Sequence, residues 1–219
     1  MVVTIDGVAG AGKSTVARMV AKQLGFKFLS TGMLYRAAAY QFDKLGLKVI
    51  NEKSIKKLLA NFKLNVDFVN DQQVIIVNGE DVTDSLRTER ISELSALLSP
   101  YENLREIIKQ IQLKISNKYN IIVDGRDTGT VVFPNAEHKF FLTADAKVRA
   151  ERRLVEIRRL GDNTTTLESV LAEINERDYI DVTRKVSPLV KASDAIEIDT
   201  TSYTADEVAS IIEKAVKNK

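Results

Sequence analysis

The sequence contains no cysteine. This absence excludes a disulfide framework, a thiolate zinc site and a cysteine nucleophile, so any metal chemistry must use oxygen ligands. Long apolar runs are absent too, since none approaches the ~20 residues of a membrane-spanning helix. The first apolar run, Val2 to Ile5, is too short for a signal sequence and has no basic flank. We therefore expect a cytoplasmic protein with no membrane association.

The chain also lacks an excess of charge of either sign. Its 32 Lys and Arg residues nearly balance 30 Asp and Glu residues, for a formal charge of +2. A surface built to coat nucleic acid would be far more basic, so we expect no nucleic-acid partner. The length of 219 residues, with 44% hydrophobic and 28% charged residues, is typical of one globular domain. We expect a monomer.

Short apolar runs alternate with long amphipathic stretches. This order is typical of parallel strands that are buried on both faces and connected by helices. The predicted strands are Val2 to Ile5, Phe26 to Leu29, Ile121 to Val123, Lys139 to Leu142, and Ala195 to Ile198. A helix is predicted over Lys13 to Leu24, closed by Gly25, and Thr204 with Glu207 forms a capping box that opens the last helix. The fold class is therefore α/β, with a five-stranded parallel sheet flanked by helices.

One stretch breaks this alternation. Apolar residues alternate with polar ones from Phe62 to Phe68, Asn70 and Asp71 form a turn, and Val74 to Val77 returns. We interpret it as a small antiparallel insert between the second and third strands of the sheet.

The strongest functional motif follows the first strand. Residues 7–15 read Gly7-Val8-Ala9-Gly10-Ala11-Gly12-Lys13-Ser14-Thr15 and match G-x-x-x-x-G-K-[ST]. The glycines allow backbone amides to surround a phosphate, and the positive end of the next helix points to the same place. Lys13 adds a point charge at the transferring phosphate, and Ser14 is the expected hydroxyl ligand of Mg²⁺. The motif predicts ATP binding but not what is done to the nucleotide.

Asp124 closes the third predicted strand. A carboxylate there could hold Mg²⁺ with Ser14, directly or through water, and the structural alternative is an aspartate that caps the next turn. A switch GTPase would need Asn-Lys-x-Asp after a strand; Asn117-Lys118-Tyr119-Asn120 lacks the acid and precedes the strand, so we interpret it as a helix end.

Arginines indicate a second phosphate, because phosphoryl transfer spreads negative charge over several oxygens. One set has helical spacing and ends at Gly161: Arg149, Arg152, Arg153, Arg158 and Arg159. The others are each next to a turn or to Asp, Thr or Tyr: Arg36, Arg87, Arg126, Arg177 and Arg184. The first set could simply be a solvated helix face.

At these residues the chain resembles the bacterial cytidylate kinases, from Thr4 to about Thr201. The most specific match is the run from Asp124 to Pro134, Asp-Gly-Arg-Asp-Thr-Gly-Thr-Val-Val-Phe-Pro. The other matching pieces are Ile5-Asp6-Gly7, Ser30-Thr31-Gly32, Tyr35-Arg36, Leu86-Arg87-Thr88, Arg177-Asp178, Asp181, Arg184 and Pro188-Leu189. The resemblance implies phosphoryl transfer from Mg²⁺-ATP to CMP or dCMP.

The resemblance also implies roles for individual residues. The residues that it places at the acceptor are Thr31, Tyr35, Arg36, Arg87, Arg126, Asp127, Arg177, Asp181 and Arg184. Among them Asp127 would read the cytosine, whereas Arg177 and Asp181 would contact the sugar. The implied catalytic residues are Lys13, Arg126, Arg152, Arg158 and Arg184. Tyr35 and Phe133 could stack on a base or belong to the core.

The implied organisation is one kinase domain, 1–219. Its core comprises 1–30, 101–147 and 185–219, the acceptor-binding region with the β insert is 31–100, and the lid that closes over ATP is 148–184. The chain departs from the family at Ala96, beside Ser95, where a serine often lies near the base. His138 has no catalytic partner in the sequence, so we interpret it as a surface or edge residue before the fourth strand. Two alternatives stay open: an acceptor such as UMP or AMP, and a nucleotide switch that transfers no phosphate.

Overall fold

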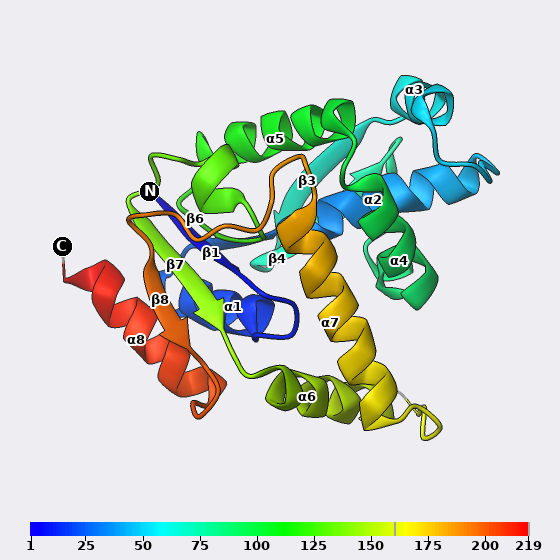
Figure 1. Ribbon diagram of the computed structural model, residues 1–219. Helices are drawn as coiled ribbons and strands as arrows, with labels where there is room; N and C mark the ends of the chain where they lie inside the picture. Colours follow the sequence, from blue (N-terminus) through cyan, green and yellow to red (C-terminus); the bar gives the residue numbers. More distant parts are fainter. Residues whose placement is uncertain (160, 219) are drawn as a thin grey trace. The chain divides into compact units, whose positions relative to one another are not determined.

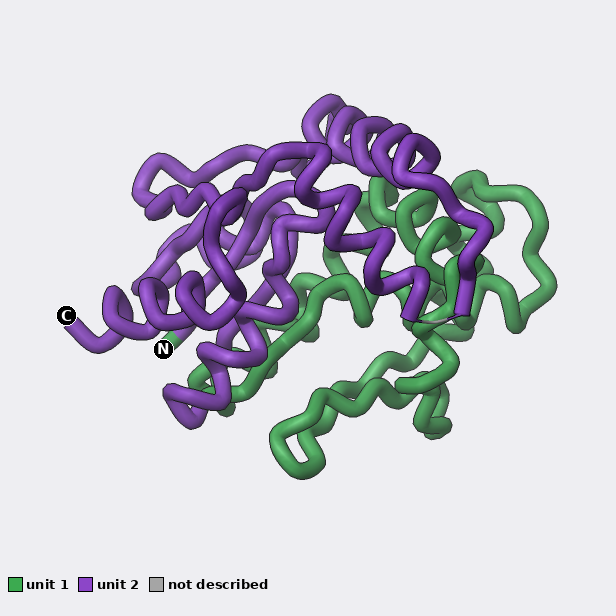
Figure 2. Tube along the Cα trace, turned by 90° about the horizontal axis from the view of Figure 1, so that it is seen from below, with its two compact units in different colours: residues 1, 26–121 green, residues 2–25, 122–219 purple. Residues whose placement is uncertain are grey.

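The computed structural model describes residues 1–159 and 161–218 (Figure 1). Leu160, inside the predicted lid range, and Lys219 lie outside the described residues. The chain divides into two compact units, drawn in separate colours in Figure 2. Unit 1 comprises Met1 and residues 26–121, and unit 2 comprises residues 2–25 and 122–219.

The five predicted strands all form, and they make one sheet in the order β2-β6-β1-β7-β8. Their bounds are β1 Val2–Gly7, β2 Lys27–Ser30, β6 Ile121–Asp124, β7 His138–Thr143 and β8 Ile196–Asp199. Strand β7 pairs in parallel with both β1 and β8. Each strand begins or ends within two residues of its predicted limits, and the predicted α/β fold class is confirmed.

Burial explains why the central strands were visible in the sequence. Ile121, Ile122 and Val123 of β6 are fully buried, and Ile5 of β1 is too. At the edge, β8 buries Ile198 but leaves Ile196 51% exposed. A strand that is covered on both faces needs a continuous apolar run, whereas an edge strand does not.

The helices of unit 2 are α1 Lys13–Leu24, α6 Ala146–Arg159, α7 Leu167–Thr183 and α8 Ala205–Lys217. Helices α6 and α7 pack against each other. Helix α1 packs against β1 and α8, and it ends at Gly25 in the left-handed conformation, as predicted. Thr204 and Glu207 form the predicted capping box at the start of α8. One π-helical turn, η2 Thr128–Val132, follows β6.

Unit 1 contains the predicted insert, which is a three-stranded antiparallel sheet. Strands β3 Leu64–Val69 and β4 Gln72–Val77 form the predicted hairpin, and a third short strand, β5 Glu80–Asp81, was not predicted. Asn70 and Asp71 turn between β3 and β4 with φ values of 49° and 62°. The helices of this unit are α2 Thr31–Lys44, α3 Glu52–Ala60, α4 Glu89–Leu98 and α5 Glu102–Ser116, with one 3₁₀ turn, η1 Asp84–Arg87.

Candidate active site

The phosphate loop connects β1 to α1, so its residues lie at the carboxyl end of a central strand. Gly7, Gly10 and Gly12 have φ values of 144°, 74° and 83°, a region that favours glycine. At Gly7 a Cβ atom would also collide with the Leu142 carbonyl oxygen of β7. Helix α1 begins at Lys13 with no acidic residue in its first turn, so its positive end is not neutralised locally.

Lys13 is a buried cation at this loop. Its ζ-amino group donates to the Val8 carbonyl oxygen over 2.5 Å, and the residue is 6% exposed. Burial, and then the nearby charge of Arg126, lower the pKa of Lys13 well below its ordinary value, while Asp124, Asp181 and Asp6 act in the opposite direction. An incoming phosphate would stabilise the protonated form, so this lysine is prepared for an anionic ligand.

Ser14 and Asp124 meet beside the loop. The Ser14 hydroxyl donates to Asp124 Oδ2, and Asp124 is 5% exposed. A hydroxyl and a carboxylate are oxygen donors of the kind that Mg²⁺ prefers, so these residues fit the metal. Among residues 1–159 and 161–218 there is no cluster of three His, Cys, Asp or Glu side chains that could hold a metal. Mg²⁺ commonly takes one or two protein ligands and completes its shell with substrate phosphates and water.

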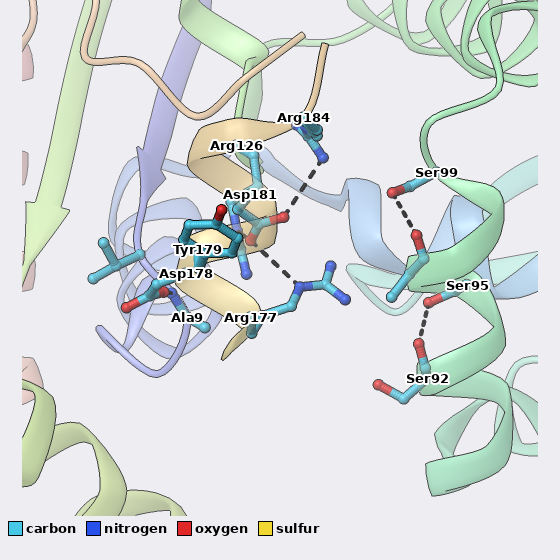
Figure 3. Close-up of polar contacts among 12 residues, drawn as sticks. Ala9, Ser92, Ser95, Ser99, Arg126, Arg177, Asp178, Tyr179, Asp181 and Arg184 are labelled. Atoms are coloured by element: carbon cyan, nitrogen blue, oxygen red, sulfur yellow. Dashed lines mark hydrogen bonds and ion pairs between the residues drawn. The ribbon is translucent and has the colours of Figure 1, made fainter. Parts of the chain in front are cut away.

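The buried carboxylate of Asp181, near the end of α7, lies close to three arginines (Figure 3). Asp181, 1% exposed, accepts from Arg126 Nε over 2.7 Å, and it lies 3.4 Å from Arg177 Nε and 3.6 Å from Arg184 NH1. Burial alone would raise the pKa of Asp181, but Arg126 and Arg177 outweigh it, and the net shift is downward. Arg184 NH2 is also 3.9 Å from Asp127 Oδ1. Three predicted site arginines of unit 2 thus surround one carboxylate, Asp181, and Arg184 connects it to Asp127.

The remaining predicted acceptor residues lie in unit 1. Arg36 of α2 donates to the Leu86 carbonyl oxygen over 3.4 Å and to Ser92 Oγ over 2.9 Å. Tyr35 packs against the guanidinium of Arg105, 5.5 Å from ring centre to carbon. Thr31 opens α2 and is buried, whereas Arg87 ends η1 and is exposed.

Helix α4 carries the position where the chain departs from the family pattern. Ser95 is buried, and its hydroxyl donates to the Ser92 carbonyl oxygen over 2.6 Å, while Ala96 is half-buried. Figure 3 shows Ser95 and Ser92 on this helix. The Ser95 hydroxyl is therefore committed to its own helix backbone.

The arginines of α6 have different surroundings. Arg149 is buried and bonds the carbonyl oxygens of Ala144 and Ala9. Arg152 donates to the Thr200 carbonyl oxygen over 2.7 Å, in the loop after β8, whereas Arg158 is exposed. The helical spacing predicted a common face, but the partner of each arginine depends on tertiary contacts that a spacing cannot show.

Three residues near the site were not singled out from the sequence. Asp6 of β1 accepts from the Thr128 amide over 3.0 Å and from the Gly129 amide over 2.7 Å, which fixes the start of η2. Its burial raises its pKa. Asp178 bonds the Ala9 amide, and the Thr200 hydroxyl bonds the Ala11 carbonyl oxygen. Asp6 and Asp178 stood inside matched motifs, but nothing in the motifs indicated these contacts.

The burial of Phe133 and of His138 tests what the sequence indicated about each of them. Phe133 is buried, 7% exposed, which favours the core over a stacking role. His138 is the first residue of β7 and is 8% exposed, so the prediction of a surface or edge histidine before the strand was wrong. Strand β7 lies between β1 and β8, and this central position buries it.

The sheet order, the phosphate loop and the arginines near Lys13 define a P-loop kinase. A family model described as Cytidylate kinase matches residues 3–218, and the chain belongs to this family. It is 43% identical to the cytidylate kinase of Carboxydothermus hydrogenoformans, over 100% of this chain and 98% of the relative. It is also 43% identical to the cytidylate kinase of Ligilactobacillus salivarius, over 99% and 96%.

A solved structure agrees with the fold. An uncharacterized protein from Eubacterium ventriosum matches with a TM-score of 0.51 and 14% identity, covering 100% of this chain and 99% of its own. At this identity the likeness shows the fold alone. Among the described residues, none of the helices combines the length and apolar character that a membrane span requires.

Proposed function

We propose that the chain transfers the γ-phosphoryl group of ATP in line onto the 5′-phosphate of CMP and dCMP. The observation that carries this is the set of cations in unit 2: Lys13 of the phosphate loop is buried, and Arg126, Arg177 and Arg184 lie 2.7, 3.4 and 3.6 Å from the Asp181 carboxylate. Lys13 would serve the donor phosphates, and the arginines would serve the second phosphate. Membership of the cytidylate kinase family selects the cytosine base.

The chain's own groups supply positioning and charge. Amides of residues 7–15 would hold the donor phosphates, and Lys13 would offset charge on the transferring group. Arg126 and Arg184, with Arg152 and Arg158 after lid closure, would stabilise the transition state. The acceptor oxygen is already ionised, so the reaction needs no strong general base.

Mg²⁺ would be held by Ser14 and Asp124. When bound it would supply positive charge that offsets the negative charge of the phosphates. Their side-chain oxygens already meet in a hydrogen bond, so one ion could be held by both, with Asp124 acting directly or through water.

Residues 31–100 would bind the acceptor and 148–184 would act as the lid. In the acceptor site Arg36, Arg87 and Arg126 would contact the phosphate and Asp127 the base, with Thr31 and Tyr35 lining the site and Arg177 and Asp181 at the sugar. Closure of the lid would exclude water, because an open site would hydrolyse ATP. The balanced charge supports an enzyme that binds no nucleic acid, and we propose that it acts as a monomer in the cytoplasm.

The test is ADP formation from Mg²⁺-ATP with each nucleoside monophosphate added separately, CMP and dCMP side by side. Strong stimulation by both cytidine nucleotides, with UMP and AMP weak, supports the proposal. Equal stimulation by UMP or AMP would indicate another acceptor. Slow hydrolysis that no acceptor stimulates would indicate a nucleotide switch.

A further inference from the structure

The backbone N–H and C=O groups of Ala9 are both hydrogen-bonded to charged side chains of unit 2. The Ala9 amide donates to Asp178 Oδ1 over 3.1 Å, and the Ala9 carbonyl oxygen accepts from Arg149 NH1 over 2.9 Å. The same Arg149 nitrogen lies 2.6 Å from Asp178 Oδ2. These three contacts close a ring at the third residue of the phosphate loop, and Figure 3 shows Asp178 beside Ala9.

The arginine in this ring is held rigidly. Its side chain is 6% exposed, and its Nε donates to the Ala144 carbonyl oxygen over 2.9 Å, just before α6. Its aliphatic part packs on the loop, because a Cβ atom added at Gly10 would approach Arg149 Cβ to 3.2 Å. The Arg149 side chain is already ordered by these contacts, so holding the loop backbone costs little further side-chain entropy.

This ion pair is not required to join α6 to α7. The two helices share an apolar core made of Ala150, Leu154, Val170 and Ile174, which Ile157, Leu167 and Leu171 extend. The Arg149–Asp178 pair is additional to that core, and apart from the Arg149 bond to the Ala144 carbonyl oxygen its bonds go to the backbone of Ala9. Its contacts thus connect the two helices specifically to the loop that is to bind ATP.

The pair also carries an electrostatic consequence. Asp178 places a carboxylate against the backbone of a loop that must bind phosphates, and an uncompensated carboxylate there would repel them. Arg149 neutralises that charge at 2.6 Å. Removing the arginine alone should therefore weaken nucleotide binding more than removing the aspartate alone.

We propose that Arg149 and Asp178 are positioning residues for the phosphate loop, which hold the Ala9 peptide so that the neighbouring amides face the donor phosphates. The inference rests on the proposed function only in taking ATP as the nucleotide bound by this loop. Arg149 thereby acts on the loop backbone, and it is not one of the arginines that touch the transferring phosphate. Because Arg149 belongs to α6 and Asp178 to α7, a movement of these helices would displace the backbone of Ala9 through this pair.

The test measures binding of a non-hydrolysable ATP analogue, AMP-PNP with Mg²⁺, by calorimetry with no acceptor present. Arg149→Met should raise the Kd about 30-fold, because it leaves the half-buried Asp178 carboxylate beside the loop without its cation. Asp178→Asn keeps an oxygen for the Ala9 amide and should raise the Kd only about 3-fold. The double variant should bind more tightly than Arg149→Met, since the repelling charge is gone.

Two further variants complete the design. Glu176→Gln removes an exposed carboxylate from the same helix α7, and its Kd should stay within about 2-fold of wild type. Arg149→Lys keeps the positive charge without the forked geometry and should lie between wild type and Arg149→Met. It also provides a folded variant if Arg149→Met does not fold. In steady-state assays the KM for ATP should rise while the KM for CMP stays within about 2-fold.

The outcomes separate the two proposals. An Arg149→Met or Arg149→Lys Kd equal to wild type, or a double variant that is weaker than Arg149→Met, would overturn the positioning role and leave the proposed function intact. A wild-type protein that does not bind the analogue would overturn both. If the wild-type protein binds the analogue tightly but no acceptor stimulates ADP formation, the kinase proposal alone is overturned. The positioning role would stand, because the calorimetric measurement contains no acceptor.

Discussion

The buried carboxylate of Asp181 accepts a hydrogen bond from Arg126 Nε over 2.7 Å, and Arg177 and Arg184 stand 3.4 and 3.6 Å away. One negative charge therefore holds three positive ones together. Without it the arginines would repel one another, and they would not be kept near the position that a phosphate is to occupy.

Acid should weaken the fold through Asp181. Its pKa is lowered in the folded protein, so its contribution to stability is complete above the unfolded value of about 3.9 and is lost as the pH falls through the lower, folded value. We expect Asp181→Asn to destabilise the protein by about 3 kcal/mol at pH 7. Urea denaturation from pH 7 to pH 3 measures this. The difference from wild type should shrink below about pH 4; a difference that grows on acidification would contradict the assignment.

Lys13→Met should separate catalysis from stability. Turnover should fall by about 10²- to 10³-fold, since one positioned cation at the transferring phosphate is lost. The midpoint of thermal unfolding should stay equal or rise, because burial of this cation is unfavourable and lowers its pKa. Lys214→Met, at an exposed position of α8, is the matched control. A near-normal rate in Lys13→Met would rule out the proposed mechanism.

The metal requirement should depend on Asp124. Chelation of divalent cations should abolish activity, and added Mg²⁺ should restore it. Asp124→Asn replaces an anionic oxygen with a neutral one, so the Mg²⁺ concentration for half-maximal activity should rise about 10-fold or more. A Mg²⁺ titration of the rate at saturating ATP measures the shift. An unchanged titration would return Asp124 to the alternative role of capping the turn after β6.

Much of the fold could be predicted because the sequence signals are local. Strands β1, β6 and β7 appeared as apolar runs, and α1 was bounded by the phosphate loop and by Gly25. Strand β5 could not be predicted, since it comprises only Glu80 and Asp81, both exposed, with no alternation of apolar and polar residues. It forms because its backbone pairs with the edge of β4 in the antiparallel direction.

The candidate site also contains residues that the sequence could place and residues that it could not. A motif places Lys13 and Ser14, and the end of β6 places Asp124, so their proximity follows from the order of elements. The partners of Arg149 and Asp178 could not be predicted, because residues 140 and 169 positions from Ala9 meet it only after α6 and α7 have packed. Arginine spacing along a helix indicates a shared face but not what covers it.

Asp127 should determine the choice of base. Its carboxylate is 9% exposed and lies 3.9 Å from Arg184. Asp127→Asn replaces an acceptor with a group that also donates, so kcat/KM for CMP should fall about 100-fold and the preference for CMP over UMP should narrow. Asp206→Asn, on the exposed face of α8, is the control. If the ratio of CMP to UMP activity is unchanged, the base is read elsewhere.

Gly129 should tolerate no side chain. A Cβ atom there would stand 2.8 Å from Thr4 Oγ1 and 3.4 Å from Asp6 Oδ2, and both residues are buried in β1. Gly129→Ala should therefore destabilise the protein by about 1–3 kcal/mol, since neither neighbour can withdraw without disturbing the sheet. Gly32→Ala is the matched control, because its Cβ would meet only Ser30 Oγ at 3.9 Å within helix α2. That change should be neutral or stabilising, as alanine favours a helix over glycine. Equal unfolding free energies for the two variants in urea would mean that the contact of η2 with β1 is loose.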